Sequence, residues 1–249
     1  MNNILLENET LTEVNENIKL IQKKNGLTFG TDAFLLASFI KQHKSATAIE
    51  LGGGTGIISL LCASREKFSK IYCLEIQSDF TDVIERNAKI NSLDSKVIAL
   101  NGDVRNIKSA DLGFEVDAVF SNPPYMKIDS GKRNNHDEKF IARHEVCGDI
   151  WDFCACAKRL LKHGGFFYCV WRPDRLVDLI CAMRENNLEP KEICFVHANT
   201  KSEPSMVLIK AKKGAASGAI IAEPLFLNCD NDAKTLTERA KKIYEECNF

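Results

Sequence analysis

The chain has 249 residues, 45% of them hydrophobic and 27% charged, with a formal net charge of −1 at pH 7 and a pI of about 6.5. This composition is typical of a folded globular protein, and the near-neutral charge excludes a strongly basic protein that coats nucleic acid, although an enzyme could still hold RNA with a local basic patch. No apolar run approaches the roughly 18 residues that a membrane span needs, and the N-terminus lacks the basic and apolar regions of a signal peptide, so we expect a cytoplasmic protein.

The first 45 residues are expected to form a segment that caps the rest of the domain. Within it, the alternating pattern of residues 18–22 predicts a short strand. Residues 31–40 place apolar side chains at helical spacing, and Thr31 or Asp32 can cap this helix. From local chemistry alone, capping is the simpler role for Asp32.

A glycine-rich loop, residues 52–56, joins a predicted strand at 46–51 to a predicted helix at 57–63. This arrangement brings backbone against a nucleotide-like ligand at the edge of an α/β sheet. The ligand is not a dinucleotide, because the third glycine of that fingerprint would fall at Ile57 or Ser59.

The spacing of the loop is acidic-x-G-x-G-x-G, from Glu50 through Gly52, Gly54 and Gly56. This pattern is similar to the cofactor loop of class I S-adenosylmethionine (SAM) methyltransferases. Glycines permit the close backbone approach that the methionine and ribose of such a cofactor require. The alternative is a glycine-rich turn without a ligand.

Two further acidic residues follow predicted strands. The strand at 70–76 contains Glu75, which lies 19 positions after Gly56, where an acid in nucleotide-binding folds accepts hydrogen bonds from ribose hydroxyls. A solvated acid at a strand end is the alternative. The strand at 96–100 precedes Asp103, which we expect to accept from the exocyclic amine of the cofactor's adenine.

The run Ser121-Asn122-Pro123-Pro124-Tyr125 ends a predicted strand at 116–121. Because prolines have a fixed φ and restrict the residue before them, the backbone around Asn122 is held in an extended conformation. Asn122 and Pro123 therefore offer oxygens in fixed positions, and Tyr125 offers a flat ring for stacking on a planar substrate. The alternative is an ordinary strand-ending turn.

The second half of the chain continues the alternation of strands and helices. Residues 126–144 are a long polar stretch, interpreted either as a lid or RNA-contacting loop or as a solvated loop. Further elements are predicted as helices at 78–91, 145–162, 174–187 and 233–246, with Gly164-Gly165 as a helix stop, and as strands at 166–171, 191–197 and 204–211.

These elements predict one α/β domain spanning residues 1–249, with a doubly wound, mostly parallel seven-stranded sheet and an antiparallel C-terminal hairpin. Together with the glycine loop, this arrangement resembles the Rossmann-like fold of class I methyltransferases. Its parts are the N-terminal cap segment (1–45), the core sheet (46–211) and a C-terminal extension (214–249) that packs on the outside. We expect a monomer.

No metal is expected. Without a secretory signal, the ten cysteines are expected to be reduced and mostly buried. Their one local cluster, Cys147, Cys154 and Cys156, lacks the paired C-x-x-C spacing of a zinc site, and the five histidines lie apart in the sequence.

The run from Asn122 to Tyr125 is similar to the N-P-P-Y motif of amino-group methyltransferases, which act on adenine N6, cytosine N4 or a glutamine side chain. The target nitrogen in these groups is a poor nucleophile because its lone pair is delocalised. Accepting both of its hydrogens, at the Asn122 side-chain oxygen and the Pro123 carbonyl, favours a pyramidal nitrogen that can attack the methyl group.

Within that group the chain resembles the bacterial tRNA(Val) adenine-N6 methyltransferase family. The resemblance rests on the glycine loop, the Asn122 to Tyr125 motif, and the segments 29–36, 142–145, 172–176, 188–191, 196–197 and 224–225.

The resemblance implies SAM as cofactor, tRNA as partner and methylation of the adenine 3′ of the anticodon. It places Thr31 and Asp32 beside the methionine end of SAM, and Asn122, Pro123 and Tyr125 at the reacting centre. An RNA enzyme with this net charge must localise its basic residues, and the substrate-binding candidates are Tyr125, Lys127, Lys132, Arg133, Arg143, Arg172 and Arg175.

Two alternatives stay open. A release-factor glutamine methyltransferase has the same chemistry, but that family usually carries a helical domain before the glycine loop, and only 51 residues precede Gly52 here. The other is a SAM-fold binding protein that has lost catalysis, against which the intact Asn122, Glu75 and glycines count.

Overall fold

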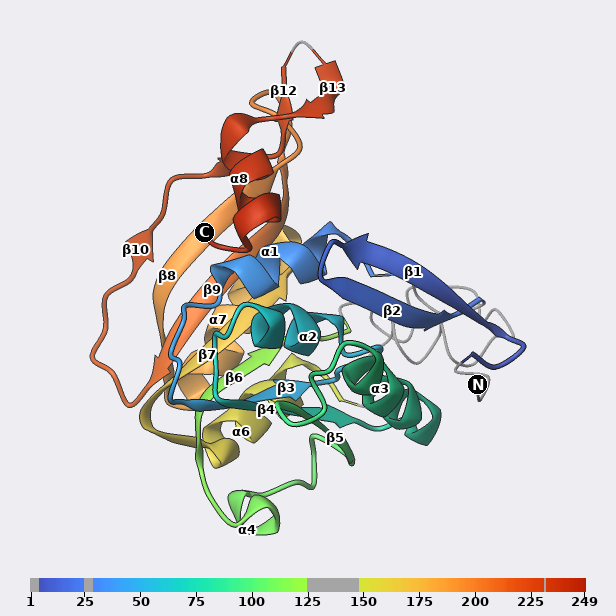
Figure 1. The fold of residues 1–249 in the computed structure, drawn as a ribbon. Coiled ribbons are helices and arrows are strands. Elements are labelled where there is room, and N and C mark those ends of the chain that lie inside the picture. The colour runs from blue at the N-terminus through green and yellow to red at the C-terminus, as the bar shows by residue number, and fades with distance from the viewer. Residues whose placement is uncertain (1–4, 25–28, 125–147, 231) are drawn as a thin grey trace, which may run out of the picture.

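A nine-stranded mixed sheet organises the computed structural model, which describes residues 5–24, 29–124, 148–230 and 232–249 (Figure 1). Its strands are β3 (Thr47–Leu51), β4 (Lys70–Glu75), β5 (Val97–Asn101), β6 (Val116–Ser121), β7 (Leu161–Trp171), β8 (Leu188–His197), β9 (Pro204–Lys213), β10 (Ile220–Ile221) and β11 (Leu225–Phe226). The order of the seven long strands is β5-β4-β3-β6-β7-β9-β8, and the two-residue strands β10 and β11 pair with β8 at the edge.

The long strands confirm the predicted fold class. Strands β3 to β7 run parallel to one another, whereas β9 is antiparallel to both β7 and β8. Chain order runs outward in opposite directions from the β3–β6 pair, and open α/β sheets bind ligands at the carboxyl ends of strands at such a switch point. The glycine loop follows β3 and Asn122 follows β6, so the two main motifs lie at this position.

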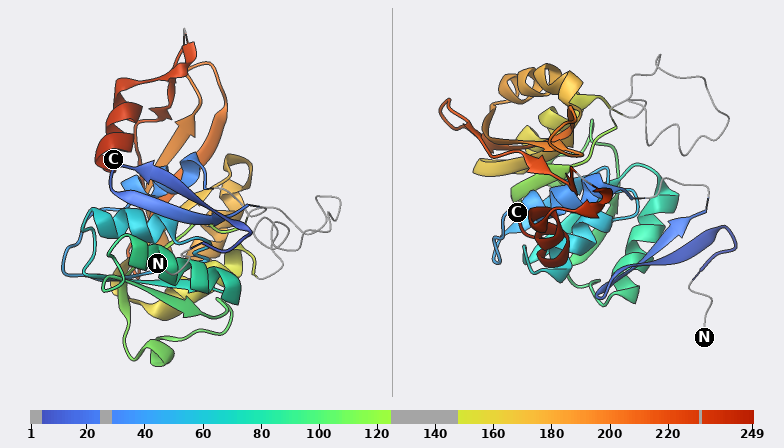
Figure 2. Two further views of the ribbon diagram at one scale, coloured as in Figure 1. Left: turned by 45° about the vertical axis from the view of Figure 1, so that its right-hand side comes forward. Right: turned by 90° about the horizontal axis from the view of Figure 1, so that it is seen from above.

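Helices cover both faces of the sheet, as the view from above shows (Figure 2). The described helices are α1 (Thr31–Phe39), α2 (Ile57–Ser64), α3 (Ser78–Ile90), α4 (Ser109–Leu112), α6 (Ile150–Leu160), α7 (Leu176–Glu185) and α8 (Glu238–Glu246). One face carries α1, α2 and α3, and the other carries α6 and α7. In the described part of the chain, none of these helices is long and apolar enough to cross a membrane.

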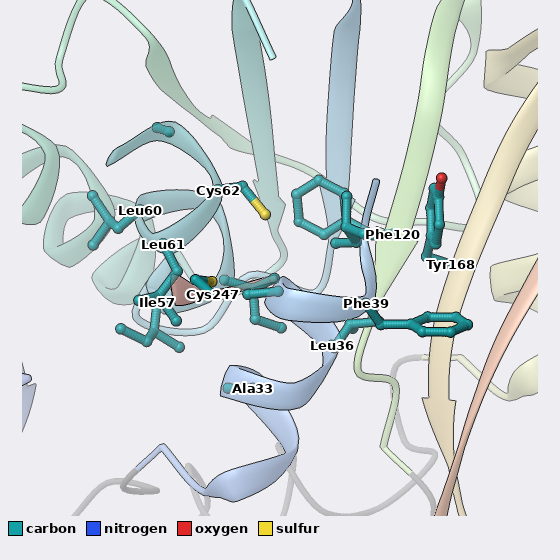
Figure 3. Packing of buried hydrophobic residues seen from close by; sticks show 14 of the residues in the cluster. Ala33, Leu36, Phe39, Ile57, Leu60, Leu61, Cys62, Phe120, Tyr168 and Cys247 are labelled. Carbon is teal, nitrogen blue, oxygen red and sulfur yellow. The ribbon is translucent and has the colours of Figure 1, made fainter. Parts of the chain in front are cut away.

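Each face has its own buried hydrophobic cluster. On the α1 side, Phe39, Phe120 and Tyr168 pack from a helix and two strands into one interior, together with Cys62 and Cys247 (Figure 3). The cluster on the other face contains residues of α6 and α7 with the apolar side chains of the strands beneath them. Burial from both faces explains why the central strands read as nearly continuous apolar runs.

The N-terminal segment forms a hairpin of β1 (Glu9–Asn15) and β2 (Ile18–Lys23), of which only the second strand was predicted. Asn87 of α3 holds this hairpin: its Oδ1 accepts from the Ile21 amide at 2.7 Å, and its Nδ2 donates to the carbonyls of Ile21 (3.1 Å) and Thr55 (3.0 Å). One buried side chain therefore joins the hairpin, α3 and the glycine loop.

Two predicted boundaries between helix and strand are wrong in the middle of the chain. The helix expected at 145–162 ends at Leu160, and β7 begins at Leu161, so the Gly164-Gly165 pair lies inside the strand rather than stopping the helix. The described helix starts at Ile150, after a reciprocal capping interaction between Asp149 and Asp152; residues 145–147 lie outside the described residues.

The helix expected at 174–187 divides into a 3-10 turn, η3 (Pro173–Arg175), and α7. The helix expected at 233–246 begins later than predicted. Residues Asp232–Leu236 form β13, paired with β12 (Asn228–Cys229), and α8 follows Thr237, whose hydroxyl accepts from the Ala240 amide at 3.1 Å. The N-cap chemistry of Thr237 accounts for the shift. Helix α8 packs against α1 with Ile243 buried.

Candidate active site

A cavity of about 960 Å³ opens at the carboxyl ends of β3, β4, β6 and β7. Its volume lies at the upper end of the range typical of cofactor and small-ligand sites. Segments that are far apart in the sequence contribute to its wall, including the start of α1, the glycine loop and the start of β9. The predicted site residues that line it are Thr31, Asp32, Glu50, Gly52, Gly54, Glu75, Asn122, Pro123 and Arg172.

The glycine loop adopts a backbone conformation that explains its composition. Gly52, Gly54 and Gly56 have φ values of +73°, +54° and +80°, which side chains with a Cβ rarely adopt. Gly53 is required for a different reason, since a Cβ there would lie 2.2 Å from Cys73 Sγ. A Cβ on Gly54 would meet no atom within 4 Å, so the loop leaves open space beside the cavity for a ligand.

Glu75 lies at the end of β4 and ties that strand to the loop. Its Oε2 accepts from the Gly54 amide at 2.9 Å, and its Oε1 accepts from the Gln77 amide at 3.0 Å. Each carboxylate oxygen has a second lone pair, and the residue lines the cavity. The carboxylate can therefore fix the loop and still accept hydroxyl hydrogens from a ligand.

Glu50 is almost fully buried beneath the loop. Its Oε2 accepts from the backbone amide of Ser59 at 3.0 Å and from the Ser59 hydroxyl, and the Cys73 thiol lies 3.5 Å away. Burial raises the pKa of Glu50 to about 7. The hydrogen bonds from Ser59 lower this pKa but only partly offset the effect of burial. A positive charge on a ligand would favour the carboxylate form.

Asn122 projects from the end of β6 toward α1. The Ser121 hydroxyl before it donates to the Leu51 carbonyl at 2.7 Å, which holds the ends of β6 and β3 together. The Asn122 side-chain nitrogen donates to Asp32 Oδ2 at 2.7 Å. The expected capping role of Asp32 or Thr31 is wrong, because the N-cap of α1 is Gly30, without a side-chain cap bond, and both residues lie in the first turn.

Three predicted residues lie away from the cavity lining. Asp103 is paired with Arg105 at 2.5 Å, which lowers the pKa of Asp103, while its neighbours Gly102 and Val104 line the cavity. Gly56 packs against Ile84 behind the loop. The guanidinium of Arg175 lies over the Trp171 ring, 5.1 Å from its centre.

The roles of Asp103, Gly56 and Arg175 stay predictions. Arg172 lines the cavity, is exposed, and donates twice to Asp174. Five predicted substrate residues lie outside the described residues: Tyr125, Lys127, Lys132, Arg133 and Arg143.

Several lining residues carry no sequence motif. Phe80 and Gln77 follow β4, and Phe80 is one apolar residue among several in an amphipathic helix. Met206 reaches the cavity because β9 runs antiparallel to β7, which places Val207 opposite Trp171. A hairpin was predicted there, but neither its insertion beside β7 nor its register could be read from local patterns.

Comparisons with known proteins agree with this architecture. A family model described as Methyltransferase small domain matches residues 24–183, more than half of the chain. A curated tRNA1(Val) (adenine(37)-N6)-methyltransferase from Phocaeicola vulgatus is 29% identical over 187 residues, which cover 74% of this chain and 76% of that protein. The protein of the same name from Flavobacterium johnsoniae is 24% identical over 203 residues, covering 81% and 85%.

Solved structures are similar in fold at low identity. One described as a predicted O-methyltransferase from Agrobacterium tumefaciens has a TM-score of 0.72 at 19% identity, over 88% of this chain and 97% of that chain. M. jannaschii TYW2 in complex with AdoMet has a TM-score of 0.56 at 15% identity, over 83% and 86%. The open glycine loop and the acidic strand ends fit this cofactor. The chain therefore belongs to the methyltransferase small domain family, and it is a SAM-dependent methyltransferase.

Proposed function

We propose that this enzyme methylates N6 of an adenine in tRNA, namely the adenine 3′ of the anticodon of tRNA(Val). The observation that supports this most directly is the position of Asn122, whose side chain lines the cavity with its nitrogen bound to Asp32. The names of the relatives from P. vulgatus and F. johnsoniae support the same substrate.

Backbone and carboxylate groups of this chain would hold the cofactor. SAM supplies an electrophilic methyl group on a sulfonium. The positive-φ glycines Gly52 and Gly54 leave room for its methionine and ribose, and Glu75 offers the free lone pairs of both oxygens to the ribose hydroxyls. Gly102 and Val104, the neighbours of Asp103, line the cavity, and we expect the adenine of SAM to lie against them.

The exocyclic amine of adenine would be activated by acceptors rather than by a base. Asn122 turns its amide oxygen away from Asp32, and the Pro123 carbonyl belongs to a residue that lines the same cavity. Two acceptors that each take one hydrogen of the amine favour a pyramidal nitrogen, whose lone pair then becomes available. No nucleophilic side chain is needed for this transfer, since positioning and fixed dipoles lower the barrier.

The RNA must be attracted locally because the net charge is −1. Arg172 is an exposed cation at the cavity wall, and its guanidinium forms an ion pair with Asp174. We propose that it contacts phosphate beside the target nucleotide, together with the basic residues of the segment that follows Pro124.

The decisive experiment is transfer of labelled methyl from SAM to total tRNA isolated from a strain lacking this protein. We expect label in tRNA with the wild-type chain and none with Asn122→Ala, although that variant should still bind SAM. A purified release factor serves as the rival acceptor. Label on the release factor alone would contradict the proposed substrate, and full activity of Asn122→Ala would contradict the proposed role of its side chain.

A further inference from the structure

Asp32 and Asn122 meet at the wall of the cavity although they lie 90 positions apart in the sequence. Asp32 lies in the first turn of α1, and its Oδ1 accepts from the Ala33 amide at 2.9 Å while its Oδ2 receives the Asn122 nitrogen at 2.7 Å. The backbone amides at the start of α1 favour a negative charge at this point. Both oxygens of the carboxylate are thus engaged, and the side chain is held from two sides.

This bond determines which end of the Asn122 carboxamide faces the cavity. A side-chain carboxamide has two ends of nearly equal size, and its terminal torsion is broad and roughly two-fold. A carboxylate only accepts hydrogen bonds, so the nitrogen end must face Asp32 and the oxygen end must face away. With the opposite orientation, Asn122 would present N–H donors to the substrate amine. That amine is itself a donor, because its lone pair is delocalised into the ring, so no hydrogen bond would form.

We propose that Asp32 is a positioning residue that fixes the orientation of the Asn122 carboxamide and so presents its oxygen to the substrate amino group. This inference rests on the proposed function, because it needs the Asn122 oxygen to accept from the substrate. It differs from the role beside the methionine end of SAM that the family resemblance implies. The two roles predict different kinetic effects when the charge of Asp32 is removed.

An exchange of the two side chains tests the pairing. Asp32→Asn allows the pair to form with either orientation of the Asn122 carboxamide. The rate at saturating SAM should therefore fall at least about twofold, the loss expected when two orientations are equally populated, while the SAM dissociation constant stays unchanged. Asn122→Asp alone places two carboxylates against each other and should be more damaging. In the double variant, the new carboxamide at position 32 can donate to the new carboxylate at position 122.

That carboxylate then offers its other oxygen to the substrate. The double variant should therefore be at least about tenfold faster than Asn122→Asp. The same substitution would harm the wild type and help the Asn122→Asp background, which a purely structural role does not produce. The matched control is Asp94→Asn, the same change at an exposed position outside the cavity, which should leave rate and SAM binding unchanged.

The measurements are methyl transfer to total tRNA from a strain lacking this protein, calorimetric SAM binding, and urea midpoints, for the wild type, the two single variants, the double variant and the Asp94→Asn control. The urea midpoints should follow the same pattern, with Asn122→Asp lowered and the double variant restored. Loss of SAM binding with an unchanged rate in Asp32→Asn would overturn the inference, as would a double variant no better than Asn122→Asp. If the wild type labels no tRNA, the proposed function fails, whereas additive midpoints would refute the pairing itself.

Discussion

The burial of Glu50 makes the stability of the cofactor-free protein depend on pH. Because the folded-state pKa of Glu50 is about 7, against an ordinary value of 4.5, the folded protein keeps this proton where the unfolded chain has released it. The contribution of protonated Glu50 to the free energy of unfolding is fully present below pH 4.5 and is lost as the pH rises through about 7. The difference between the unfolded-state pKa of 4.5 and the folded-state pKa of about 7 corresponds to roughly 3 kcal/mol of unfolding free energy, at about 1.4 kcal/mol per pH unit.

Glu50→Gln replaces the ionisable group with one that stays neutral. The Ser59 and Cys73 donors all approach Oε2, and a glutamine can keep an oxygen at that position. We expect urea unfolding between pH 4.5 and 8.5 to show the wild type losing roughly 3 kcal/mol relative to Glu50→Gln, mostly below pH 7. Parallel curves of unfolding free energy against pH for the two proteins would show that Glu50 does not keep a raised pKa in the folded protein.

Cofactor binding gives the same group a second readout. Since a cation favours the ionised carboxylate, SAM should bind the wild type more tightly as the pH rises through 7, and this dependence should disappear in Glu50→Gln. Calorimetric titration of SAM at pH 6 and pH 8 measures it. An affinity that is independent of pH in both proteins would contradict the role of Glu50 beside the cofactor.

Three further predictions concern residues that form the glycine loop or contact it. Glu75→Gln should weaken SAM binding on the order of tenfold, through lost charge-assisted hydrogen bonds, and an unchanged dissociation constant would contradict the ribose role. Gly53→Ala should cost about 1–3 kcal/mol by crowding Cys73 Sγ. In a Cys73→Ala background the same substitution should leave the urea midpoint nearly unchanged, and an equal cost in both backgrounds would argue against this clash. Asn87→Ala should lower the free energy of unfolding by roughly 2–3 kcal/mol, because the buried Ile21 amide loses its acceptor. The loss should exceed that of Asn91→Ala, which removes similar but exposed bonds to Lys19. Equal losses in the two variants would exclude burial as the reason.

Short-range patterns predicted much of the sheet and the two main motifs. The glycine loop, Glu75 and Asn122 all follow strands whose apolar runs are clear in the sequence, and parallel strands place their carboxyl ends at one edge. The pattern also predicted the antiparallel hairpin of β8 and β9. These features depend on residues within a few positions of one another, which is why local periodicity was sufficient.

Features that depend on distant residues were not predictable in this way. The bond between Asp32 and Asn122 joins α1 to β6, and local chemistry favoured a cap instead. The polar strand β1 lacks a clear apolar alternation, and its position depends on β2 and thus on Asn87 of α3. Asp103 was placed by its position after a strand, but pairing with Arg105 is a matter of side-chain geometry.

Asn122 and Pro123 are proposed to present two acceptors to an exocyclic amino group. Identification of the methylated nucleoside tests this role most directly, using mass spectrometry with synthetic standards after digestion of tRNA that the wild-type protein has modified. We expect N6-methyladenosine from the wild type and none from Asn122→Ala. Methylation of a ring nitrogen or of a ribose hydroxyl, with no N6-methyladenosine, would contradict this role.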